Sequence, residues 1–116
     1  MDNEKVFQMD FAKVYPLLVN KVVRKGRTKE EADEVILWLT GYSQKQIDQM
    51  AESGICYRDF FLNAPAMNPN RSKITGVVCG IRVENIEDPL MREVRYLDKL
   101  IDEVAKGKTL DKVLRK

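Results

Sequence analysis

The side chains best suited to bind a small ligand lie in one basic segment near the middle of the chain. Asn70, Arg71, Ser72 and Lys73 precede an apolar run that could begin a helix. Arginine and lysine beside the free N–H groups of a helix start can hold a phosphate or a carboxylate. With Arg82 added from further along the chain, the pattern predicts an anion or nucleotide site. The ordinary alternative is that Asn70 or Ser72 caps a helix and the basic side chains are solvated.

A second arrangement could bind nucleic acid. Residues 29–53 predict two helices joined by a tight turn at Gly41, as in a helix-turn-helix. The second helix would present side chains that can read base edges: Gln44, Lys45 and Gln49. A basic cluster before the first helix could contact phosphates through Arg24, Lys25 and Arg27. Two acidic residues on the same reading helix, Asp48 and Glu52, and a formal net charge of only +2 argue against nucleic-acid binding.

Enzyme chemistry has few candidate residues in this chain. There is no histidine, which removes the commonest general base and the commonest metal ligand. Two cysteines cannot complete a four-ligand zinc site. Cys79, in an apolar run between Gly76 and Gly80, is predicted to be a buried and inert thiol, and Cys56 to be more exposed. These residues favour a protein that is not an enzyme, although the anion-site alternative leaves enzyme activity open, and we expect no cofactor or metal.

Sequence signals for the start and the end of a helix alternate along the chain. Thr28 with Glu31 and Ser43 with Gln46 have the spacing of capping boxes, and glycines follow the apolar runs after them. Asp88 before Pro89 predicts a third start. These signals predict an all-α fold, a compact bundle of about five or six short helices.

The clearest predicted helix covers residues 89–106. Its apolar residues step by four and three, as in a heptad seam, and they are Leu90, Val94, Leu97, Ile101 and Val104. Such a stripe could seal either a core or a dimer. The first helix is predicted to start near Asp10, with a disruption at Pro16, and to end at Gly26.

Residues 74–86 are ambiguous between helix and strand. Ile74, Val77, Val78 and Ile81 have helical spacing, which favours a helix. Alternation of β-branched residues over the same segment suits a strand. We choose the helix, because a lone strand needs a partner and the only other candidate, around Val6, is short. Gly76 and Gly80, four apart, would then form a smooth face for helix packing.

Length and composition indicate one globular unit. Of the 116 residues, 44% are hydrophobic and 33% are charged. We expect residues 1–9 to be a loose arm, with Val6 and Phe7 packing back, and residues 10–116 to be a single helical domain. Without a signal peptide or membrane span, the expected location is cytoplasmic.

Three segments carry a resemblance to a known family. They are Phe11-Ala-Lys-Val-Tyr-Pro-Leu-Leu-Val, Trp38-Leu-Thr-Gly-Tyr-Ser and the stretch from Asn68 to Lys108. Over about residues 11–114 the chain resembles a small family of uncharacterised bacterial proteins, a domain of unknown function. The resemblance implies a bacterial, cytosolic, single-domain protein and transfers no activity. Our leading hypothesis is a non-enzymatic helical interaction module that self-associates as a homodimer and does not contact membranes.

Overall fold

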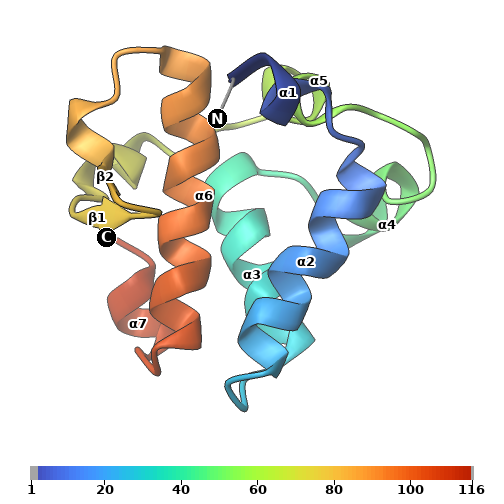
Figure 1. The fold of residues 1–116 in the computed structure, drawn as a ribbon. Coiled ribbons are helices and arrows are strands. Elements are labelled where there is room, and N and C mark those ends of the chain that lie inside the picture. Colours follow the sequence, from blue (N-terminus) through green and yellow to red (C-terminus); the bar gives the residue numbers. More distant parts are fainter. Residues whose placement is uncertain (1–2, 116) are drawn as a thin grey trace.

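A computed structural model describes residues 3–115 (Figure 1). Seven α-helices, one small hairpin and two 3-10 helices follow one another in these residues. In chain order they are α1 Asn3–Gln8, α2 Phe11–Val23, α3 Lys29–Thr40, α4 Gln44–Met50, α5 Tyr57–Leu62, η1 Pro69–Lys73, β1 Val77–Val78, β2 Ile81–Arg82, η2 Val83–Asn85, α6 Pro89–Ala105 and α7 Leu110–Val113.

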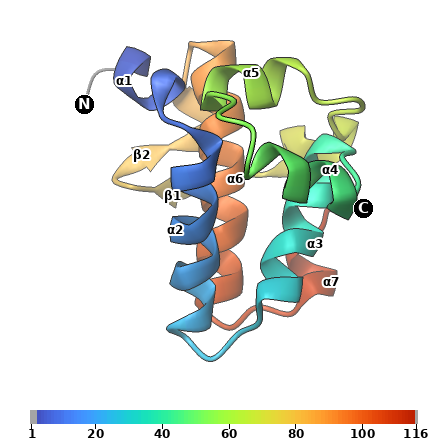
Figure 2. The same cartoon turned by 90° about the vertical axis from the view of Figure 1, so that its right-hand side faces the viewer.

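Helix α6 is the centre of the fold and packs against α2, α3, α5, α7 and the hairpin (Figures 1 and 2). The side chain of Asp88 accepts hydrogen bonds from the N–H groups of Leu90 and Met91, which confirms the predicted start. Most of the predicted stripe is buried in the protein's own core, with Leu97, Leu100 and Ile101 fully buried. The stripe therefore seals a core and is not left over for a partner.

Helices α2 and α3 complete the group of long helices around this core. Phe11 and Val22 from α2 and Val35, Ile36 and Leu39 from α3 are fully buried. The predicted disruption at Pro16 is wrong, since α2 continues through it. Pro16 lies on the exposed side of α2, where the carbonyl that loses its N–H partner can bond to water.

The predicted capping boxes are both present. Thr28 and Glu31 exchange their hydrogen bonds at the start of α3, and Ser43 and Gln46 do so at the start of α4. Gly41 ends α3 with a left-handed backbone, φ 78°. These local signals were sufficient to predict both ends of α3.

The predicted helix over residues 74–86 is wrong, because the segment contains an antiparallel hairpin. Val77 pairs with Arg82 and Val78 with Ile81, so each strand finds its partner within the segment itself. The two turn residues, Cys79 and Gly80, both have positive φ, 53° and 76°, as in the turn type that matches strand twist. The thiol of Cys79 is consequently exposed rather than buried, while Cys56 is half-buried. The two glycines at 76 and 80 belong to the hairpin and form no helix face.

The segment expected to be a loose arm contains the helix α1 over Asn3–Gln8. Val6 and Phe7 of α1 are buried, and the guanidinium of Arg58 lies 5.4 Å from the ring centre of Phe7. A backbone bridge between Asp10 and Cys56 ties the chain after α1 to the start of α5. Residues 1 and 2 lie outside the described part of the chain.

Candidate ligand pocket

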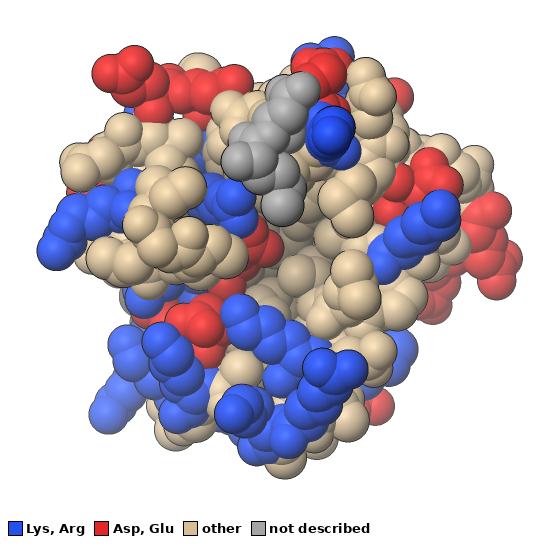
Figure 3. Space-filling view, viewed as in Figure 1, with Lys and Arg blue, Asp and Glu red and all other residues tan. Residues whose placement is uncertain are grey.

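A pocket of about 270 Å³ lies between α2 and α6, and α1 and the first residue of α5 close it. Figure 3 shows a hollow in the middle of this face of the molecule. Six of the ten residues that line the pocket are apolar: Val6, Met9, Val14, Leu17, Leu18 and Val94. The other four are Lys21, Tyr57, Arg95 and Asp98. A mainly apolar wall with a few polar groups is typical of small-molecule sites.

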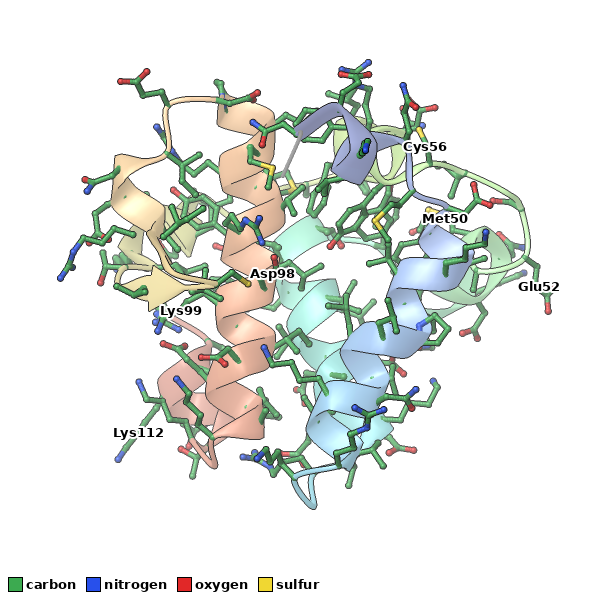
Figure 4. The ribbon with its side chains drawn as sticks, viewed as in Figure 1. Met50, Glu52, Cys56, Asp98, Lys99 and Lys112 are labelled. Atoms are coloured by element: carbon green, nitrogen blue, oxygen red, sulfur yellow. The ribbon has the colours of Figure 1, made fainter. Side chains whose placement is uncertain are left out.

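Arg95 and Asp98 form an ion pair in the wall of this pocket. The Nη1 atom of Arg95 lies 2.9 Å from the Oδ2 atom of Asp98, and the two side chains are only 14% and 20% exposed. Burial raises the pKa of Asp98, while the charges of Arg95 and Lys21 oppose that rise. Asp98 lies on the side of α6 toward α2, whereas Lys99 points to the hairpin (Figure 4).

Two polar atoms of the pocket residues are buried without a hydrogen-bond partner among the residues described. They are the hydroxyl of Tyr57 and the Nε atom of Arg95. Tyr57 is 2% exposed, and burial raises the pKa of its hydroxyl well above the usual value, so the hydroxyl stays neutral. A buried donor without an acceptor costs about 1–3 kcal/mol, and native proteins contain few of them. Both atoms belong to residues that line the same pocket.

The comparison with protein families decides to which family the chain belongs. Residues 5–115 match the model of a family described as an uncharacterized protein conserved in bacteria, DUF2200. The chain belongs to this family. A crystal structure of the uncharacterized protein SP1917 is similar to it, with a TM-score of 0.93 and 47% sequence identity over 98% of this chain and 93% of that one. Among curated proteins, none matches this chain.

These comparisons confirm the resemblance predicted from the sequence and assign no activity. The matched region begins a few residues earlier than predicted and includes all four polar residues of the pocket. In the described part of this DUF2200 chain, no helix is long and apolar enough to cross a membrane. Nor do its described side chains form a group of three or more that could hold a metal ion.

The predicted anion site is only partly assembled. Arg71 and Ser72 line a second pocket of about 320 Å³ together with Arg92, Glu93 and Tyr96, whereas Lys73 and Arg82 do not line it. The Nε atom of Arg71 bonds to Glu93 at 3.0 Å and its Nη1 atom to the carbonyl of Asn68 at 2.8 Å. The chain continues from η1 into the hairpin, so the α-helix start on which the prediction depended is absent from this segment.

The predicted helix-turn-helix residues have mixed roles. Arg27 bonds to Glu31 and donates to the carbonyls of Val104 and Lys108, which makes it a structural link between α3 and the end of α6. Gln44 donates to Asp48, and Asp48 joins acidic residues of α3 in a groove lined also by Lys29, Glu30, Asp33 and Glu34. Four predicted residues are exposed: Arg24, Lys25, Lys45 and Gln49. Nucleic-acid binding stays a prediction, and the groove between α3 and α4 carries the wrong charge for it.

Sequence reasoning missed the four polar residues of the α2–α6 pocket. Arg95 and Asp98 flank the apolar stripe of α6 at a spacing of three, which is the spacing of an ordinary surface ion pair. Tyr57 is 38 residues earlier in the chain, and no motif joins it to them. A charged pair next to a heptad seam is the one signal that could have directed attention to this side of α6.

Proposed function

We propose that this protein binds a small amphipathic organic molecule in the pocket between α2 and α6. The observation that carries the proposal is the pair of unpartnered buried atoms, the hydroxyl of Tyr57 and Nε of Arg95, in residues that line a mainly apolar pocket. A ligand with a polar head and an apolar body would satisfy both parts of this lining.

The lining supports a binding role better than a catalytic one. Among the described residues around the pocket there is no cysteine, serine or threonine to act as a nucleophile. Asp98 is already paired with Arg95, and the hydroxyl of Tyr57 remains protonated. These groups can hold and orient a polar head group, and the apolar residues can cover the rest of the molecule.

The apolar stripe of α6 was the reason to expect self-association, and this stripe is buried in the protein's own core. The predicted homodimer and the cytoplasmic location remain predictions. Two exposed apolar residues, Leu17 at 60% and Met9 at 39%, lie at the pocket. We assign them to the ligand entrance rather than to a second copy, and sedimentation at micromolar concentration distinguishes the two.

The proposal is tested by NMR titration of the ¹⁵N-labelled protein with small amphipathic compounds that share one apolar body and differ in head group. Binding should shift the amide signals of Leu17, Tyr57 and Asp98 by more than those of residues outside the pocket. Leu17→Trp should narrow the entrance and weaken binding at least about tenfold. Leu62→Trp is the matched control, because Leu62 is 65% exposed and lies outside this pocket. Shifts confined to another surface, or no binding at millimolar concentration, would overturn the proposal.

A further inference from the structure

We infer that the ligand of this pocket is a small monocarboxylic acid, whose carboxylate accepts hydrogen bonds from Nε of Arg95 and the hydroxyl of Tyr57. The inference rests on the proposed function and names the class of molecule that the site selects. It follows from three properties of the pocket, which are its free donors, the geometry of the guanidinium and the balance of charge.

The free donors require an acceptor on the ligand. The Nε–H group of Arg95 can only donate a hydrogen bond, and the hydroxyl of Tyr57 can donate one as well. An ammonium group offers no acceptor, so it would leave Arg95 unsatisfied. A carboxylate has two oxygens, and each can accept one of these two bonds, which are both charge-assisted because the acceptor is ionised.

Asp98 uses only one side of the Arg95 guanidinium, and the Nε–H group on the other side has no acceptor among the residues described. Asp98 takes the Nη1 atom, whereas Nε–H points to the other side of the guanidinium, toward Nη2. Arg27 provides an example in the same protein, because its Nε and Nη2 atoms both bind Glu31 while its Nη1 atom donates to two carbonyls. A ligand carboxylate at Nε of Arg95 would reproduce that arrangement without displacing Asp98.

The charges and the size of the pocket fit one carboxylate. Arg95, Lys21 and Lys106 contribute three positive charges, and Asp98 and Asp102, which pairs with both lysines, contribute two negative charges, which leaves one positive charge to be neutralised. Lys21 also lies 3.3 Å from Asp102, so it stays at the rim instead of closing on the head group. At about 30 Å³ for each non-hydrogen atom, as in liquid water, the volume of about 270 Å³ corresponds to roughly nine such atoms.

The test compares four probes with the same eight-carbon chain at pH 7: octanoate, octanamide, 1-octanol and octylamine. Affinities are measured by calorimetry and by the NMR titration described above, below the concentration at which each probe aggregates. Octanoate should bind at least about tenfold more tightly than 1-octanol, and octylamine should bind most weakly. Tyr57→Phe should weaken octanoate about tenfold and leave 1-octanol within about twofold.

Two further variants test whether the Nε donor, and not only the positive charge, is needed, and whether a tyrosine hydroxyl outside the pocket has any effect. Arg95→Lys keeps the positive charge but removes the Nε donor, so octanoate should lose its advantage over 1-octanol. Tyr42→Phe is the control, because the Tyr42 hydroxyl donates to the carbonyl of Phe60 at 2.6 Å, outside the pocket, and octanoate affinity should be unchanged. Each variant is first shown to be folded by circular dichroism.

The outcomes distinguish this inference from the proposed function. If none of the four probes binds, the proposed function itself fails. If 1-octanol or octylamine binds as tightly as octanoate, or if octanoate binds equally to wild type and Tyr57→Phe, the pocket stands and the carboxylate assignment is overturned. Strong octanoate selectivity that Tyr57→Phe and Arg95→Lys both remove supports it.

Discussion

The Nη1 atom of Arg95 donates to the Oδ2 atom of Asp98 at 2.9 Å, from a position three residues earlier on the same helix. The pair lies in the wall of the α2–α6 pocket, where both side chains are largely shielded from solvent. Burial raises the pKa of Asp98, and the nearby Arg95 is the main group that opposes this rise. The charge state of Asp98 therefore depends on its partner, which leads to a first prediction.

Removing Arg95 should make folding stability depend on pH through Asp98. In Arg95→Met the pKa of Asp98 should rise further, because burial is then opposed only by Lys21. The native state would hold a proton that the unfolded chain releases, so the free energy of unfolding should fall as pH rises through the raised pKa. At pH 7 we expect a loss of about 2 kcal/mol, measured by urea unfolding between pH 4 and pH 8.

The double variant Arg95→Met/Asp98→Asn is the control for this first prediction. It has no carboxyl group at residue 98, so the extra pH dependence should disappear and part of the lost stability should return. Equal slopes of stability against pH in the single and double variants would show that Asp98 is not the titrating group.

Removing the hydroxyl of Tyr57 should cost no stability, in contrast to the same change at Tyr42. The Tyr57 hydroxyl is buried without a partner, so Tyr57→Phe should leave the free energy of unfolding unchanged or raise it by up to about 1 kcal/mol. Tyr42→Phe breaks the bond to the Phe60 carbonyl and should lower it by about 1–2 kcal/mol. Urea unfolding of the two variants without ligand measures both, and a clear loss in Tyr57→Phe would mean that its hydroxyl has an acceptor.

The ends of the helices were predictable because the groups that determine them are neighbours in sequence. Thr28 and Ser43 each bond within three residues, and Asp88 bonds to the next turn of its own helix. The hairpin was harder, since the periodicity of residues 74–86 fits both structures. Its turn uses Cys79 in a positive-φ conformation that residues other than glycine rarely adopt, so the usual asparagine–glycine signal was missing.

The candidate site could not be predicted because it is defined by what a side chain does not contact. Nothing in the sequence shows that the Tyr57 hydroxyl lacks a partner or that Arg95 keeps one free donor. The opposite holds for Arg71, whose type and neighbours predicted a ligand site. Glu93, 22 residues later, binds its guanidinium instead. Partners at such separations depend on the packing of η1 against α6, which local patterns do not encode.

The ion pair of Arg27 and Glu31 should stabilise the fold only while Glu31 is charged. Its hydrogen bonds with Arg27, supported by the backbone N–H of Thr28, lower the pKa of Glu31. A lowered pKa means that the stabilisation is complete above the unfolded-state pKa, about 4.3, and is lost as pH falls through the folded-state value. Glu31→Gln keeps the capping box but removes the charge, so it should cost about 1 kcal/mol at pH 7 and progressively less below pH about 4.

Chemical unfolding of wild type and Glu31→Gln at several pH values measures this difference. Glu30→Gln is the matched control, since Glu30 is exposed one position earlier on α3 and its substitution leaves the Arg27–Glu31 pair intact. A stability difference between wild type and Glu31→Gln that persists unchanged at pH 3 would contradict the electrostatic origin of the effect.

Two glycine-to-alanine variants separate backbone strain from a steric clash at the turn between α3 and α4. Gly41 and Gly54 have nearly the same left-handed φ, 78° and 76°, so alanine should cost about 1–2 kcal/mol at either position through the backbone alone. A Cβ atom at Gly41 would also lie 2.9 Å from the Cβ and carbonyl oxygen of Ala66, whereas at Gly54 it would meet nothing within 4 Å. The N–H group of Ala66 donates to the carbonyl of Thr40, so this segment cannot move freely away from the turn. The free energy of unfolding should therefore fall by at least about 1 kcal/mol more in Gly41→Ala than in Gly54→Ala, as measured by urea unfolding. Equal losses of unfolding free energy in the two variants would mean that the segment around Ala66 moves away from the new Cβ atom, and that close packing against Ala66 does not stabilise the turn.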